Sequence, residues 1–89
     1  MNLTKENIIK HNKHILAVSG GDFSILQEGD LDFAIDSVNY EPNFIDKATN
    51  FLYYGANGHF FEAGNKRTAF EISKGLLASG GRIFNALEQ

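Results

Sequence analysis

Apolar side chains recur at intervals of three and four residues in four blocks of the chain, and glycines lie between several of these blocks. This spacing puts the apolar groups on one face of an α-helix, and helices bury such faces against one another. The alternation typical of a half-buried strand is missing, apart from a short extended piece around Phe23–Leu26. Because 89 residues supply one small core, the sequence predicts a single all-α domain over residues 1–89 with four main helices.

Capping residues indicate where the first two helices begin and end. Thr4 is suited to cap the N-terminus of the first helix, and Gly20-Gly21 is suited to end it. The second helix is expected to be short, with Leu31, Ala34, Ile35 and Val38 on its apolar face. Asp30 and Asp32 lie near its start, where the helix dipole favours negative charge.

The third and fourth helices form the second half of the chain. The third is expected to begin near Pro42, whose fixed φ suits a first helical position, and to end at a breaker over residues 55–58. The fourth is expected over about residues 65–79, with Gly80-Gly81 as its stop. The apolar positions predict two buried stripes, which consist of Phe44, Ile45, Ala48, Phe51 and Leu52 in the third helix and Ala69, Phe70, Ile72, Leu76 and Leu77 in the fourth.

Composition excludes several classes of protein. The chain contains no cysteine, which excludes disulfides, a thiol nucleophile and cysteine-bound metal. No apolar run approaches the ~20 residues of a membrane span, and the N-terminus does not resemble a signal peptide, so a cytoplasmic location is expected. The net charge is −3, and residues 20–50 carry seven acids against Lys47 alone. Binding of nucleic acid through a basic patch is therefore not expected.

Residues 58–69 hold the side chains best suited to chemistry. Gly64 lies where a loop enters the fourth helix, and the unpaired N–H groups of a helix N-terminus form an anion site. Lys66 and Arg67 add two cations to the same turn, which suits a polyphosphate. His59 is the nearby group that can accept a proton near neutral pH. The residues alone leave two interpretations open, a phosphoryl- or nucleotidyl-transfer site and a solvated helix terminus.

The same segment resembles the signature of a known family. The order His59-x-Phe61-x-x-Gly64-Asn65-Lys66-Arg67 is similar to the motif of the Fic/Doc family. Further similarity to the Doc (death-on-curing) branch lies at Thr68-Ala69, Leu76-Leu77 and Gly80, and upstream at His11, Ser19-Gly20-Gly21, Glu28-Gly29, Leu31 and Ala34. The resemblance implies a Fic/Doc-like helical bundle, in which a central motif loop leads into a helix N-terminus.

The resemblance also implies a role for each motif residue. His59 would be the base that deprotonates a target hydroxyl, and Phe61 would pack inward and fix the loop. Gly64, Asn65 and Lys66 would form the anion hole, and Arg67 would hold the phosphates of ATP. Fic proteins transfer AMP to a protein hydroxyl. Doc instead phosphorylates elongation factor Tu, as the toxin of a toxin–antitoxin pair, so a protein target and an antitoxin are the implied partners.

Three positions depart from the family pattern. The acidic residue that holds Mg²⁺ in the family is Ala63 here, and Glu62 is the neighbouring carboxylate that could replace it. Leu26-Gln27 stands where Doc relatives carry an Arg-Asp pair. Relatives continue for two more helices after Gly80-Gly81, so a shortened C-terminus is expected, with apolar faces covered by a second copy or an antitoxin. A catalytically degenerate module that binds a partner or nucleotide without transfer therefore remains the alternative function.

Three smaller features have competing interpretations. Ser24-x-x-x-Glu28-Gly29 resembles the inhibitory motif of some Fic proteins, in which the Glu pairs with the signature Arg, but an acid-Gly pair also simply begins a helix. His11 and His14 have the spacing of a metal pair, although one packed and one solvated histidine is expected. Most aromatic residues near the site are expected in the core, with one at the border of an adenine pocket. These residues are Phe51, Tyr53, Tyr54, Phe60 and Phe61.

Overall fold

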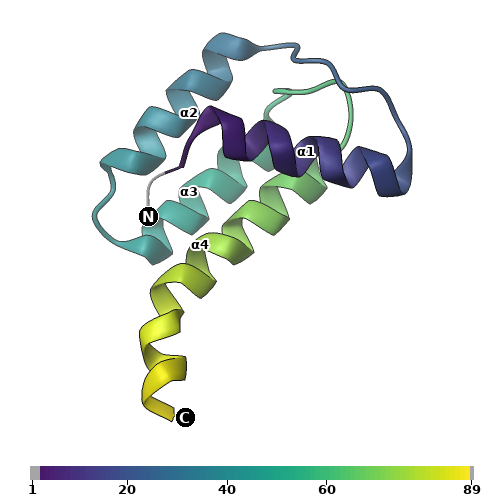
Figure 1. Cartoon of the computed structure of the whole chain (residues 1–89). Coiled ribbons are helices and arrows are strands. Elements are labelled where there is room, and N and C mark those ends of the chain that lie inside the picture. Colours follow the sequence, from purple (N-terminus) through teal and green to yellow (C-terminus); the bar gives the residue numbers. More distant parts are fainter. Residues whose placement is uncertain (1–2, 89) are drawn as a thin grey trace.

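The computed structural model describes residues 3–88, with side chains up to residue 79, and over this range the chain is a four-helix bundle (Figure 1). The helices are α1 (Lys5–Ser19), α2 (Glu28–Tyr40), α3 (Phe44–Asn57) and α4 (Asn65–Glu88). The prediction of an all-α fold with four main helices is confirmed. Within the described range, no helix combines the length and the apolar content that crossing a bilayer requires.

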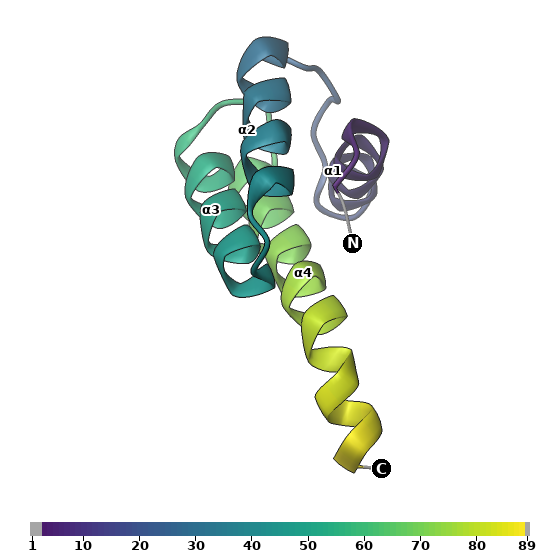
Figure 2. The ribbon, with the colours of Figure 1, turned by 90° about the vertical axis from the view of Figure 1, so that its left-hand side faces the viewer.

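The four helices enclose one core. α3 and α4 lie side by side, α2 packs against α3, and α1 crosses the N-terminal half of α4 (Figures 1 and 2). Each helix contributes apolar residues to one buried cluster, which consists of Leu3, Ile8, Leu31, Ala34, Ile35, Val38, Ala48, Phe51, Phe60, Phe61, Ala69, Ile72 and Leu76. This arrangement holds the loop between α3 and α4 against α1.

Side chains and glycines define the helix ends. The Thr4 hydroxyl accepts a hydrogen bond from the Asn7 N–H at 3.2 Å, and Gly20 ends α1 with φ +87°, which confirms both predicted caps. α3 begins at Phe44, two residues after Pro42, so Pro42 precedes the N-cap and is not the first helical residue. Its N-cap is Asn43, whose side-chain oxygen accepts from the N–H groups of Ile45 and Asp46.

Gly55 does not break α3, and the prediction of a breaker that begins there is wrong. The helix continues to Asn57, and Gly58 is its C-cap. Gly55 is buried where α3 meets α4, and a Cβ atom at this position would lie 2.5 Å from the Cβ of Ala69. Nearby, the Ser73 hydroxyl donates to the Ala48 carbonyl at 3.1 Å. The glycine therefore permits a close approach of two helices.

The close approach also explains an error in the predicted stripes. Small residues occupy the contact between α3 and α4, so bulky side chains lie at its flanks. Of the predicted core positions, Ala48, Phe51, Ala69, Ile72 and Leu76 are buried, but Ile45, Leu52, Phe70 and Leu77 are 40–56% exposed. Thr68 and Ser73, which an apolar pattern omits, are buried instead.

α4 continues through Gly80-Gly81 to Glu88, so the prediction that these glycines stop the helix is wrong. A glycine in a helix interior costs about 1 kcal/mol relative to alanine, but it keeps its backbone hydrogen bonds. Figure 2 shows the second half of α4 extending past the other three helices.

Lys47 links α3 to the end of α2. Its side chain is buried, and Nζ donates to the carbonyls of Val38 and Asn39 at 3.2 Å each. These carbonyls lie in the last turn of α2, where the regular hydrogen bonds of the helix end; the Val38 carbonyl also accepts from the Glu41 N–H at 3.1 Å. Asn39 in turn exchanges two hydrogen bonds with the backbone of Leu3, at 2.7 and 2.8 Å. The end of α2 is thus tied to both α3 and the start of the chain.

Candidate functional site

The loop of residues 58–64, called the motif loop below, joins α3 to α4 and pairs with the extended piece before α2. Ile25 and Phe61 form an isolated antiparallel bridge. The Leu26 N–H donates to the Phe60 carbonyl at 2.8 Å, and the Glu62 N–H donates to the Ser24 carbonyl at 2.9 Å. The expected extended piece at Phe23–Leu26 therefore exists, and it supports the motif loop from one side.

Asn65 fixes the motif loop from the other side. Its side-chain oxygen accepts from the Phe61 N–H at 2.9 Å, and its Nδ2 donates to the Phe61 carbonyl at 2.7 Å. The Phe61 ring is buried, with 1% of its surface exposed. Because the Asn65 side chain is used in this way, the groups of Asn65 left to face an anion are those of its backbone.

Asn12 is a site residue that the sequence reasoning missed. Its side chain is fully buried, and Nδ2 donates to the Ala63 carbonyl at 2.9 Å and to the Thr68 hydroxyl at 3.1 Å. One contact before Gly64 and one after it hold the junction of loop and helix against α1. The signal was present in the sequence, because Asn12 is a polar residue one turn after Ile8 on the apolar face of its helix.

Gly64 has the backbone conformation that this junction requires. Its φ is +77°, which disfavours residues with a Cβ, and an added Cβ would lie 3.2 Å from Nδ2 of Asn12. α4 begins at the next residue. The first N–H groups of α4 have no acceptor within the helix and are available to an anion.

The predicted site residues line one open cavity of about 350 Å³ at the start of α4. Its lining consists of residues 62–67 together with Ala56, Gly58 and His59. His59, Lys66 and Arg67 are exposed, so their charged or protonatable groups reach solvent. The structure thus brings together a histidine, two cations and a helix N-terminus, a set that can bind an anion and accept a proton.

A comparison with protein-family models matches residues 2–77 to the Fic/DOC family. The chain belongs to the Fic/DOC family. Comparisons with curated proteins and with solved structures gave no match. The matched range contains α1, α2, α3, the motif loop and the first half of α4.

Ala63 stands where the sequence analysis expected an acidic metal ligand, and Glu62 precedes it. Ala63 and Glu62 both line the cavity, but Ala63 has no side-chain oxygen. Over the described range, no three histidine, aspartate or glutamate side chains lie close enough to hold a metal ion. Glu62 supplies the carboxylate among the residues that line this cavity.

Glu28, the glutamate of the motif that resembles a Fic inhibitory sequence, contacts α1. Its carboxylate lies 2.9 Å from Nζ of Lys5, whose other partner is Asp32 at 2.7 Å. The hydrogen bonds of Lys5 to these two carboxylates raise the pKa of Lys5, and the bond to Asp32 has the larger effect, followed by the bond to Glu28. Because Glu28 pairs with Lys5, the structure favours the interpretation that Glu28-Gly29 simply begins α2.

The two histidines of α1 and the aromatic residues occupy different surroundings. His11 and His14 are both exposed, so the expectation of one packed histidine is wrong. Phe51 and Phe60 belong to the core, as expected. Tyr53 is 66% exposed, and it lines a second cavity of about 300 Å³ that reaches Gly58 of the motif loop.

Proposed function

We propose that this Fic/DOC protein is a Doc-like transferase that moves a phosphoryl group, or alternatively AMP, from ATP to a Ser or Thr hydroxyl of a protein. The observation that supports the proposal is the placement of His59, Lys66 and Arg67 around one cavity at the N-terminus of α4. The proposed partners are an elongation factor Tu-like target and an antitoxin or a second copy, in the cytoplasm.

The chemistry requires three actions from these residues. His59 takes the proton of the target hydroxyl as its oxygen forms a bond to phosphorus. The bond between phosphorus and the bridging oxygen breaks, and the leaving group is ADP in phosphoryl transfer or pyrophosphate in AMP transfer. The N–H groups after Gly64, together with Lys66 and Arg67, hold the phosphates and stabilise the charge that develops on them.

Glu62 is the proposed protein ligand for Mg²⁺ that arrives with the nucleotide. Mg²⁺ at nucleotide sites is commonly held by one or two carboxylates and by phosphate oxygens, so a single carboxylate fits this role. No step of the mechanism above depends on the ion.

Incubation of candidate target protein with ATP labelled at either the α- or the γ-phosphate tests the proposal. γ-Label on the target indicates phosphoryl transfer, and α-label indicates AMP transfer. His59→Ala should lower the rate about 10²–10⁴-fold, the typical contribution of a general base. Lys66→Gln should weaken ATP binding, whereas Lys74→Gln, on the same helix but outside the cavity, should not. If calorimetry detects no binding of ATP with or without Mg²⁺, the proposal is wrong.

Ala63 favours a second candidate, a module that keeps the fold and binds a partner or nucleotide without transfer. The variant Ala63→Asp separates the two functions, because it restores the carboxylate of the family motif. ATP-dependent labelling that arises only in this variant supports the second candidate. High labelling by the natural chain that His59→Ala abolishes contradicts it. Bound ATP that leaves no label on any protein indicates a nucleotide-binding module.

A further inference from the structure

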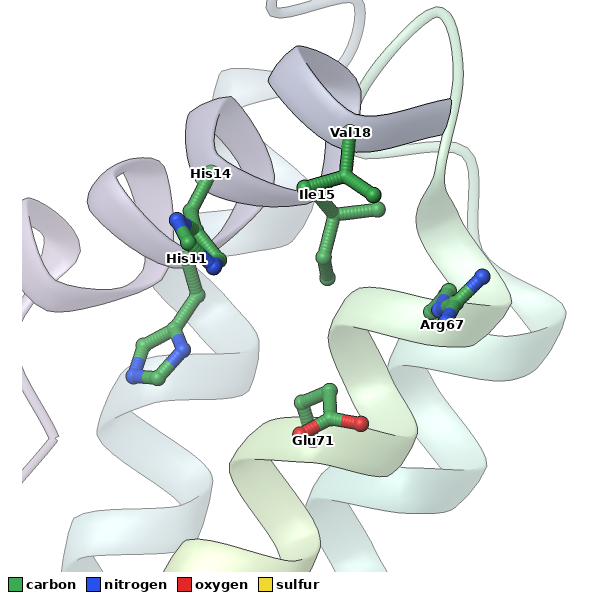
Figure 3. Close-up of a pocket in the computed structure, with 6 residues that line it drawn as sticks. All are labelled: His11, His14, Ile15, Val18, Arg67 and Glu71. Atoms are coloured by element: carbon green, nitrogen blue, oxygen red, sulfur yellow. The ribbon is translucent and has the colours of Figure 1, made fainter. Parts of the chain in front are cut away.

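A separate cleft lies between α1 and α4. It has a volume of about 300 Å³, and it is lined by His11, His14, Ile15, Val18, Arg67 and Glu71. Figure 3 shows the α1 side chains on one side of the cleft and Arg67 and Glu71 of α4 on the other. Ile15 is buried, so the cleft has an apolar base below its polar side chains.

The ionisable groups of this cleft are not paired with one another. Over the described range, the ion pairs within 4 Å are those of Lys5 with Glu28 and with Asp32. Arg67, Glu71 and the two histidines therefore surround an open space without closing it by a salt bridge. A cationic group held beside a cavity in this way is available to an anionic ligand.

Arg67 connects the cleft to the anion site, since its side chain lines both cavities. A guanidinium carries five N–H donors in a planar fork, so it can bind oxygen atoms on two sides at once. Glu71 repels an anion in the cleft. Protonation of His11 and His14 adds two positive charges on the opposite side, which offsets this repulsion.

We propose that the α1–α4 cleft is a second anion subsite, joined to the first through Arg67, which takes a phosphate-class group and binds it more tightly when His11 and His14 are protonated. The inference rests on the proposed function only for the phosphate-binding role of Arg67.

Three other charged groups lie near the two histidines. They are Lys10 on α1, which lines the neighbouring surface with both histidines, and Arg67 and Glu71 on α4. No charged side chain of α2 lines the cleft. Histidine titrates near pH 6.5, whereas Glu, Lys and Arg titrate far from it. A rise in anion affinity as the pH falls from about 8 to about 5.5 would therefore report the protonation of histidine.

The experiment is a calorimetric titration with trimetaphosphate, whose own charge does not change over this pH range. We expect binding to become about tenfold tighter from about pH 8 to about pH 5.5, which corresponds to about 1.4 kcal/mol. The double variant His11→Gln/His14→Gln should lose this gain and keep the affinity measured at the higher pH. Both residues are exposed, so the fold should be unchanged, and circular dichroism checks this.

Two control variants make the result specific. His59 is a third histidine and lines the adjoining cavity, so His59→Gln measures its own contribution to the gain, which should be the smaller part. Lys13→Gln removes a cation of α1 that lies over the Phe23 ring, 4.7 Å from its centre, and outside the cleft. Lys13→Gln should keep the full gain.

Three results would overturn the inference: an equal gain in the double variant, no gain in the natural chain, or no binding of trimetaphosphate at either pH. These results are distinct from failure of the proposed function, which is measured by transfer of label from ATP. A histidine-dependent gain without transfer leaves the subsite and removes the transferase. Transfer of label from ATP without a histidine-dependent gain in affinity supports the transferase and removes the subsite.

Discussion

At the scale of single residues, two side-chain amides determine the path of the motif loop. Asn65 holds the backbone of Phe61 through both a donor and an acceptor, and Asn12 holds the carbonyl of Ala63. The sequence identified Asn65 through its motif but not this use of its side chain. Hydrogen bonds to distant backbone atoms produce no periodic pattern in a sequence. A polar residue on an apolar helix face, such as Asn12, was the feature from which such a bond could have been predicted.

Substitution of Asn65 should release the loop in a way that depends on the replacement. Asn65→Ala removes both hydrogen bonds to Phe61 and should cost about 1–3 kcal/mol of unfolding free energy. The Phe61 amide should then exchange with solvent faster. Asn65→Asp keeps the acceptor, so this amide should stay protected while anion binding weakens through charge repulsion. Hydrogen exchange followed by NMR measures both, and equal protection of Phe61 in all three proteins would contradict the assignment.

Glycines offer a second prediction at this scale. Gly55→Ala places a methyl group against Ala69, and such overpacking costs about 1–3 kcal/mol, more than alanine gains in helix propensity. Gly75 lies in α4 with no atom within 4 Å of an added Cβ, so Gly75→Ala should stabilise the protein by up to about 1 kcal/mol. Urea unfolding of the two variants should give opposite signs. Ala69→Gly should recover part of the stability lost in Gly55→Ala.

At the scale of helices, the ends and the faces differed in how well the sequence predicted them. Thr4 and Gly20 act locally, so their caps were predictable from residue type. The buried faces of α3 and α4 were not, because the distance between two helices decides which residues fit between them. Gly55, Ala69 and Ser73 allow the close contact, whereas Phe70 satisfies the apolar pattern and still lies outside it.

The end of α2 provides a prediction at this scale. Lys47→Met removes the donor that two carbonyls of α2 share, and it should cost about 1–3 kcal/mol. For a domain of this size the melting temperature should fall by roughly 4–8 °C per kcal/mol. Lys74→Met, an exposed lysine of α4, should change it little. An unchanged melting temperature in Lys47→Met would show that water replaces the side chain at no cost.

At the scale of the whole molecule, the helical class followed from the sequence, and the contribution of α1 to the surroundings of the motif did not. The motif in residues 59–67 predicted an anion site. The structure places His59 and residues 62–67 around one cavity, whereas Phe60 and Phe61 belong to the core. The contribution of α1 could not be predicted, since it arises from the crossing of α1 over α4. Asn12, His11 and His14 reach the motif region only through that crossing.

The contacts of Asn12 join residues that lie 51 and 56 positions apart in the chain. Contacts of such separation require closure of a long loop, and the entropy of that closure delays them during folding. The α3–α4 pair can form from neighbouring segments, but the junction at Gly64 is completed only when α1 docks. A molecule whose first helix has detached should therefore keep most of its helical content and lose the support that Asn12 gives to the motif loop. The order of the motif loop, more than helicity, therefore measures the native population of this protein.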